Sequence, residues 1–311
     1  MAANAETKEF LEEIAEAKAK PFQEMTPAEA RETWHTMVSL FAGPPEPVAS
    51  IDDVIIPSPG HDLELRVYTP SGAGPFGALV YFHGGGWVIG TADTYQVVCR
   101  ALANASGCKV LVPTYRMAPE YKYPIAVEDC YNAFSWIVEH SSELDIDPNR
   151  VAIGGDSAGG NLTAAVSLMA RDKGGPTAAF QLLMYPVTDY NFETESYREY
   201  AEDHYLTADA MIWFWNLYLP TPEAGKEPYA SPLRANDLSG LPPALVVTAE
   251  CDVLRDEGEA YAARLKEAGV SANLHRAEGM IHGYIHPLGG RLPFAEEAIR
   301  HAASAIKEVF E

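Results

Sequence analysis

A serine between two glycines is the first candidate for chemistry in this sequence. Residues Gly155-Asp156-Ser157-Ala158-Gly159 fit the pattern G-x-S-x-G, after an apolar run at 151–153. The pattern is typical of a nucleophile elbow, a sharp strand-to-helix turn that exposes a serine hydroxyl above the end of a sheet. At a helix N-terminus the hydroxyl would lie where backbone N–H groups favour negative charge. A glycine-rich connecting turn is the alternative, so further residues must decide.

A second glycine-rich segment could supply the hydrogen-bond donors that such a serine needs. His83-Gly84-Gly85-Gly86-Trp87 comes directly after the apolar run 78–82. Consecutive glycines let the backbone approach a ligand closely, and their N–H groups can stabilise the oxyanion that forms during attack on an ester. A phosphate-binding loop is disfavoured, because neither G-x-x-x-x-G-K-[ST] nor G-x-G-x-x-G is present.

A carboxylate that could orient a catalytic base follows the strand predicted over 244–249. Three acids compete there: Glu250, Asp252 and Asp256. Asp256 is explained by a capping box, Asp256-Glu257-Gly258-Glu259, at the start of the next helix. Glu250 lies too near the strand end to project freely. Asp252 is therefore the favoured residue.

Among the nine histidines, His282 is the favoured base. It lies in a glycine-flanked loop after the strand predicted over 271–275, whereas His275 lies in that strand and His286 precedes a proline. His282 and His286 have the i, i+4 spacing of zinc ligands, but Gly283 replaces the glutamate of H-E-x-x-H, so we expect no metal. A lone histidine is more often structural, but this one completes a set with the serine and the acid.

The elements that must position these residues alternate in type. The period-two runs 51–56 and 62–68 predict a hairpin closed around Ser58-Pro59-Gly60. Strands are then predicted over 78–82, 109–113, 151–154, 179–185, 244–249 and 271–275, with helices over 94–105, 125–139, 158–171, 257–268 and 294–309. This alternation predicts an α/β fold with a mostly parallel central sheet, helices on both faces and antiparallel strands at one edge.

Two segments lie outside this alternation. Residues 1–47 predict helices over 7–20 and after the capping box at Thr26-Pro27-Ala28-Glu29, whose apolar stripe includes Trp34. Residues 187–230 contain no predicted strand but an aromatic helix that begins after Leu206-Thr207. Core packing is one interpretation of that helix. We favour a lid that lines a substrate pocket.

Composition and charge exclude several classes of protein. The chain has 311 residues, of which 47% are apolar and 21% charged, as in ordinary globular proteins. Its net charge of −22 argues against nucleic acid and anionic membranes as partners. Residues 1–47 carry nine acids against four bases, and residues 187–230 carry nine against two.

The sequence also indicates a compartment. The polar, acidic start does not resemble a signal peptide, and no apolar run reaches the length of a membrane span. The cysteines lack C-x-x-C spacing, so we expect buried free thiols in a cytoplasmic protein; they are Cys99, Cys108, Cys130 and Cys251.

The motifs together resemble the signatures of the hormone-sensitive lipase-like family (family IV) of bacterial carboxylesterases. The similar segments are His83–Gly86, Tyr115–Glu120, Gly155–Gly160, Tyr185-Pro186, Ala230–Leu233, Asp252–Gly258 and Gly279–Gly283. The resemblance runs from about residue 50 to the C-terminus. One departure is Val253, where the family usually has proline.

The resemblance implies an α/β-hydrolase fold with a helical cap. Residues 1–47 and 187–230 would form the cap, and 48–186 and 231–311 the core. It implies Ser157 as nucleophile, His282 as base and acid, and Asp252 as the group that orients His282. It further implies an oxyanion hole from the N–H groups of Gly85, Gly86 and Ala158. The residues expected to line the substrate pocket are Asp156, Tyr185, Met211 and Trp215.

The expected activity is hydrolysis of short- to medium-chain acyl esters through an acyl-enzyme, without metal or cofactor. Bulky cap residues would exclude long chains; they are Met211, Trp213, Phe214 and Trp215. The expected partner is a small-molecule ester, and the sequence is compatible with a homodimer. Amide or formamide hydrolysis on the same fold is an alternative. A non-catalytic receptor, such as the gibberellin receptors that resemble this family, is disfavoured because all three triad positions are filled.

Overall fold

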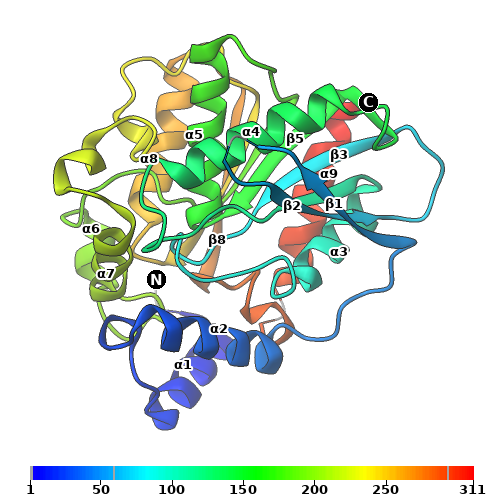
Figure 1. The fold of residues 1–311 in the computed structure, drawn as a ribbon. Helices are drawn as coiled ribbons and strands as arrows, with labels where there is room; N and C mark the ends of the chain where they lie inside the picture. Colours follow the sequence, from blue (N-terminus) through cyan, green and yellow to red (C-terminus); the bar gives the residue numbers. More distant parts are fainter. Residues whose placement is uncertain (1–2, 59, 293) are drawn as a thin grey trace.

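The centre of the molecule is a twisted sheet with helices on both faces (Figure 1). The computed structural model describes residues 3–58, 60–292 and 294–311. Within these residues the sheet has eight strands in the order β1-β2-β4-β3-β5-β6-β7-β8. The strands are β1 (Ser50–Ile56), β2 (Leu63–Thr69), β3 (Phe76–Phe82), β4 (Lys109–Pro113), β5 (Ile146–Asp156), β6 (Phe180–Met184), β7 (Ala244–Cys251) and β8 (Ala272–Ile281).

Two strand pairings are antiparallel and the others are parallel. β1 pairs with β2 and β2 pairs with β4 in antiparallel register, whereas the pairs from β4 through β3 to β8 are parallel. The predicted mostly parallel sheet with an antiparallel edge is therefore confirmed. Pro59 of the predicted hairpin turn lies outside the described residues.

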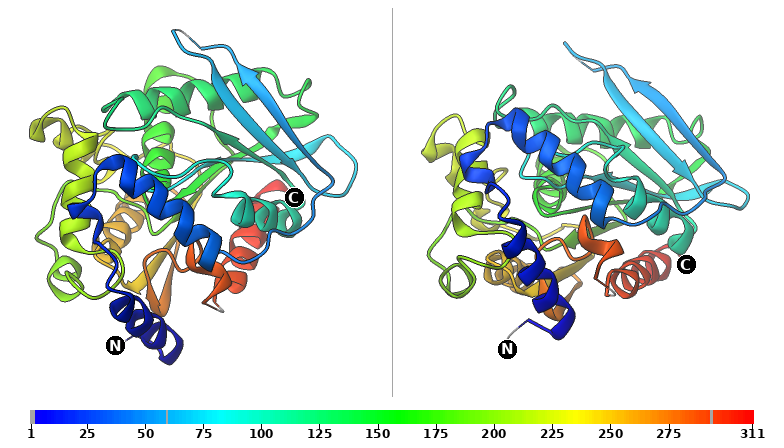
Figure 2. Two further views of the ribbon diagram at one scale, coloured as in Figure 1. Left: turned by 60° about the horizontal axis from the view of Figure 1, so that its bottom comes forward. Right: turned by 90° about the horizontal axis from the view of Figure 1, so that it is seen from below.

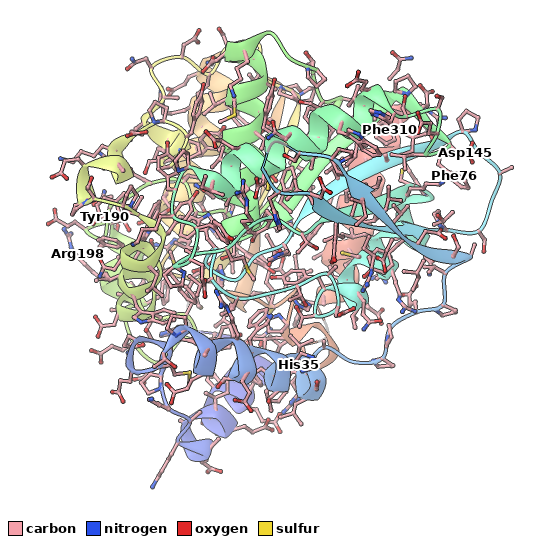
Figure 3. All side chains as sticks on the ribbon, viewed as in Figure 1. His35, Phe76, Asp145, Tyr190, Arg198 and Phe310 are labelled. Atoms are coloured by element: carbon pink, nitrogen blue, oxygen red, sulfur yellow. The ribbon has the colours of Figure 1, made fainter. Side chains whose placement is uncertain are left out.

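Helices cover both faces because the parallel strands are apolar on both sides. α4 (Ile125–Glu139) and α5 (Ala158–Lys173) pack together on one face, while α3 (Gln96–Ser106) and α9 (Ala295–Phe310) lie side by side on the other (Figure 2). α8 (Arg255–Glu267) shares a buried apolar cluster with α5. Near the C-terminus Phe310 lies beside Phe76 (Figure 3), and its ring occupies the space that a side chain at Gly77 would need.

Several element boundaries differ from the predicted ones. β5 begins at Ile146 and β8 extends to Ile281, because pairing with neighbouring strands continues beyond the apolar runs. The capping box predicted at Asp256 is wrong: α8 begins at Arg255, and its N-cap, Leu254, makes no side-chain bond. The Asp256 carboxylate instead accepts a hydrogen bond from the Ser196 backbone N–H at 2.8 Å.

In the view of Figure 1 the N-terminal helices lie below the sheet and the segment 187–230 lies to its left, and Figure 2 shows both from below. The first comprises α1 (Ala5–Ala17), the short helix η1 (Phe22–Glu24) and α2 (Pro27–Phe41), whose predicted capping box at Thr26 is present. The second contains α6 (Glu195–Glu199), α7 (Ala208–Tyr218) and η2 (Pro222–Lys226). The two segments meet where the rings of Phe22 and Phe214 lie 5.8 Å apart.

Hydrogen bonds attach both segments to the sheet domain. The Arg31 guanidinium of α2 donates to the carbonyls of Val88 and Ala118, both at 2.9 Å, and pairs with Glu120. In α5 the Asn161 side-chain amide donates to the carbonyl of Val187 at 3.0 Å and to that of Ala230 at 2.9 Å. Asn161 thus holds the two ends of the segment 187–230 together. The remaining short helices are η3 (Pro232–Arg234) and η4 (Leu288–Gly290).

All four cysteines are buried and free, as the sequence predicts. In the described part of the chain, no helix combines the length and apolar character that a bilayer crossing requires.

Candidate active site

The predicted elbow lies between β5 and α5. Ser157 has φ 55° and ψ −119°, an unfavourable backbone conformation for a residue with a side chain. A side chain at Gly159 would collide with the Phe82 carbonyl, which explains the glycine there. The Ser157 N–H donates to the Met184 carbonyl at 2.8 Å, so the turn is fixed against the next strand.

Three predicted residues come together at this turn. His282 Nε2 lies 2.9 Å from Ser157 Oγ, and His282 Nδ1 lies 2.7 Å from Asp252 Oδ2. Asp252 follows β7 and His282 follows β8. Because adjacent parallel strands end at the same edge of the sheet, their loops meet there. Asp252 also accepts a hydrogen bond from the Leu254 N–H at 3.0 Å, which fixes the carboxylate beside the imidazole.

The glycine loop after β3 presents backbone donors to the same place. Gly85 has φ +99° and Gly86 has φ +58°, conformations that a side chain rarely adopts. Space is also lacking, since a side chain at Gly86 would collide with the Phe214 ring and one at Gly85 with the Ile89 carbonyl. Among the described residues, nothing accepts a hydrogen bond from either N–H. Ala158 is the first residue of α5, so its N–H has no acceptor within the helix.

Asp156 connects the elbow to the glycine loop. Its buried carboxylate accepts hydrogen bonds from Tyr81 Oη at 2.8 Å, Tyr95 Oη at 3.0 Å and the Gly84 N–H at 3.0 Å. Burial raises the pKa of Asp156 to about 6, and these bonds oppose the shift. The contacts assign Asp156 a structural task, which is to hold Gly84 and the glycines after it above Ser157.

A small cavity adjoins Ser157 and His282. It has a volume of about 40 Å³, and a water molecule needs about 10–15 Å³ on this measure, so the enclosed space beside the two side chains is small. The lining residues are Phe22, Trp34, Gly85, Gly86, Ile89, Tyr95, Asp156, Ser157, Tyr205, Leu206, Met211, Phe214, His282, Gly283, His286 and Pro287.

The residues that line the cavity include only two of the four pocket residues expected from the sequence. Asp156 and Met211 line the cavity, but Tyr185 and Trp215 do not. The Tyr185 ring lies behind His282, with its centroid 4.7 Å from that of the imidazole. Trp215 is fully buried on another side of α7, where its ring lies 4.6 Å from that of Trp87.

Several lining residues were not predicted from the sequence, among them two aromatic residues of the N-terminal helices. Phe22 lies in a short helix that no pattern indicates, and Trp34 belongs to the apolar stripe of α2, which is equally typical of core packing. Tyr205 carries no motif. The sequence suggests His286 as a base or as a zinc ligand but favours neither role, and the described residues contain no cluster of three metal-ligating side chains.

These features define a class of protein. Residues 79–286 match the alpha/beta hydrolase fold family, so the chain belongs to that family and the predicted fold is confirmed.

Several of its relatives among known proteins are named as esterases. The carboxylic ester hydrolase LipN of Mycobacterium tuberculosis is 44% identical over 264 residues, which cover 82% of this chain and 70% of LipN. An arylesterase of Saccharolobus solfataricus is 37% identical over 286 residues, 92% of this chain and 93% of that protein. The crystal structure of a thermostable esterase from Pseudomonas putida ECU1011 is 39% identical and matches with a TM-score of 0.96, covering 100% of this chain and 98% of that one.

Proposed function

We propose that this protein is a serine carboxylesterase that hydrolyses short- to medium-chain acyl esters. The observation that carries the proposal is the hydrogen-bonded series Ser157 Oγ, His282 and Asp252 at the wall of a cavity. The esterase names of the relatives support it. In the proposed division, residues 1–47 and 187–230 form a cap over a core of 48–186 and 231–311.

Acylation uses the three side chains of the triad and the backbone donors beside them. Before attack, Asp252 fixes the tautomer of the neutral His282 imidazole. Ser157 Oγ then attacks the ester carbonyl carbon while His282 Nε2 takes the hydroxyl proton, and Asp252 stabilises the resulting imidazolium. The tetrahedral oxyanion accepts hydrogen bonds from the N–H groups of Gly85, Gly86 and Ala158. One such donor typically contributes about 3–4 kcal/mol of transition-state stabilisation. The imidazolium then protonates the departing alkoxide, which leaves an acyl-enzyme.

Deacylation repeats these steps with water as the nucleophile. His282 removes a proton from water as its oxygen attacks the acyl carbon, and the same three N–H groups hold the second oxyanion. Protonation of Ser157 Oγ then releases the carboxylic acid.

The proposed chain-length range follows from the size of the cavity. With about 40 Å³ available, a long acyl chain has no room unless Met211 and Phe214 move. The acidic charge of residues 1–47 and 187–230 would also be repelled by an anionic lipid surface.

Ser157→Ala tests the proposal, with Ser239→Ala at an exposed position as the matched control. We expect Ser157→Ala to lower kcat on p-nitrophenyl acetate by roughly 10⁴-fold or more, with unchanged thermal unfolding. A phosphonate inhibitor should label Ser157 in the wild type. Labelling of another serine, or an active Ser157→Ala protein, would disprove the assignment.

Two substrate series refine the proposed activity. kcat/KM on p-nitrophenyl esters from acetate to palmitate should be largest for the short and medium chains, and a maximum at palmitate would contradict the proposed range. Matched ester and anilide substrates separate an esterase from an amide hydrolase. Faster turnover of the anilide would favour the latter.

A further inference from the structure

Two polar side chains in the cavity wall have no hydrogen-bond partner among the described residues. These atoms are Tyr205 Oη and His286 Nε2, and both are buried. Buried polar atoms in proteins are almost always hydrogen-bonded, so each such atom requires an explanation. Most other side chains in the wall are apolar, among them Phe22, Ile89 and Phe214.

Both residues lie close to Gly283 in the loop that carries His282. A side chain at Gly283, the next residue, would approach the Tyr205 ring to 3.1 Å and the His286 carbonyl to 3.3 Å. The His286 ring lies 4.1 Å from that of Tyr95, which hydrogen-bonds Asp156 next to Ser157. Tyr205 and His286 therefore both belong to the part of the cavity wall that adjoins the His282 loop.

The backbone at Tyr205 is unusual. Tyr205 has φ 70° and Asp203 has φ 60°, and a bulky residue rarely adopts such values. Strain of this kind concentrates at functional sites, where the surrounding structure enforces it. Here the unusual backbone places a tyrosine from the segment 187–230 in the same cavity wall as a histidine from the loop after β8.

The charge of the wall restricts what could bind there. Burial lowers the pKa of His286 to about 3, so its ring is neutral at pH 7, and burial raises the pKa of Tyr205. No lysine or arginine belongs to the described lining. A carboxylate or phosphate would therefore lose its hydration without gaining a cation, whereas a neutral oxygen could accept from the Tyr205 hydroxyl and, in the tautomer protonated at Nε2, from His286.

We propose that Tyr205 and His286 bind a neutral oxygen atom on the part of the ester that is not attacked. The inference rests on the proposed ester hydrolysis and specifies its substrate class. The preferred substrates are small esters whose acyl or alcohol part carries an ether, hydroxyl or keto oxygen, rather than plain alkyl esters.

Matched ester pairs test this preference. Ethyl methoxypropanoate against ethyl pentanoate probes the acyl side, and methoxyethyl acetate against butyl acetate probes the alcohol side. For each pair the ratio of kcat/KM values is measured in the wild type, Tyr205→Phe and His286→Phe. Tyr229→Phe and His35→Phe are the controls; Tyr229 Oη bonds Asp172 outside the cavity, and His35 lies on the exposed side of α2 (Figure 3).

We expect the ratio for one pair to fall about 5- to 150-fold in Tyr205→Phe and His286→Phe, and to stay at the wild-type value in both controls. Comparing each variant with the wild type cancels the intrinsic reactivity of the two esters. Ratios within twofold of the wild type in both variants, for both pairs, would overturn the inference. If His286→Phe does not fold, Tyr205→Phe decides alone, because it removes a single oxygen atom.

A binding measurement separates this inference from the proposed catalysis. In a Ser157→Ala background, the oxygenated ester should raise the Tm more than its alkyl partner, and adding Tyr205→Phe should abolish the difference. A wild type that hydrolyses neither pair would refute the esterase proposal, whereas equal Tm shifts from both esters would refute the recognition of oxygen.

Discussion

Replacing Asn161 with alanine should loosen the segment 187–230 at both ends. The side-chain amide of Asn161 donates to the carbonyls of Val187 and Ala230, and all three residues are fully buried. Leaving a buried acceptor without a partner costs about 1–3 kcal/mol, so losing both bonds should lower the free energy of unfolding by about 2–6 kcal/mol. At about 2–4 °C per kcal/mol for large domains, the Tm should fall by roughly 5–20 °C.

The measurement is thermal unfolding at pH 7, with Thr163→Val as the control. Thr163 is equally buried two residues further along α5, but its hydroxyl donates only within the helix, to the Gly159 carbonyl at 2.8 Å. Because Met211 and Phe214 lie on the loosened segment, kcat/KM should fall more in Asn161→Ala than in the control. A Tm of Asn161→Ala equal to that of Thr163→Val would refute the idea that Asn161 closes the segment.

Phe214→Ala should shift the optimum of the p-nitrophenyl ester series toward longer acyl chains, because the ring lies against Gly86 in the cavity wall; an unchanged optimum would contradict this role. The pKa of His286, about 3, lies below its ordinary 6.5, so the stability that its neutral ring provides is present above pH 6.5 and is lost as the pH falls toward 3. Between pH 7 and 5, the free energy of unfolding measured in urea should therefore fall by about 2 kcal/mol less in His286→Phe than in the wild type. Parallel pH profiles of the two proteins would count against a buried neutral ring. Arg31 holds α2 against the loop at Val88, so Arg31→Ala should lower the free energy of unfolding by about 1–2 kcal/mol and should also lower kcat/KM. The control, Arg291→Ala, removes an exposed ion pair with Glu13 and should change both quantities less.

The alternation of strands and helices was predictable because each of them has a signal in its own stretch of sequence. The apolar runs give β4 and α4 their observed ends, and the capping box at Thr26 starts α2. The order of strands in the sheet could not be predicted in this way, since it depends on which strands pair over long separations. The start of α8 was also missed, because Asp256 bonds to Ser196 of a distant segment rather than to its own helix.

The clustering of the candidate triad was easier to predict than the cavity wall. Ser157, Asp252 and His282 lie in motifs at fixed places relative to strands, and the structure brings their side chains within hydrogen-bond distance. The cavity wall depends on which side of a helix faces inward. α7 is apolar on nearly every side, so the pattern could not distinguish Met211, which lines the cavity, from Trp215, which packs on Trp87.

The origin of the cavity wall in distant parts of the chain has a consequence for folding. Phe22 and Trp34 come from the first helices, Phe214 from the middle segment and His286 from a loop after the last strand. Contacts between residues so far apart in sequence require large loops to close, which makes them slow to form. The sheet can therefore assemble before the cavity exists, and during synthesis the side of Trp34 that packs on His286 stays uncovered until nearly the whole chain has been made. Overproduction of this protein should accordingly depend on chaperones that shield the N-terminal helices while the rest of the chain is completed.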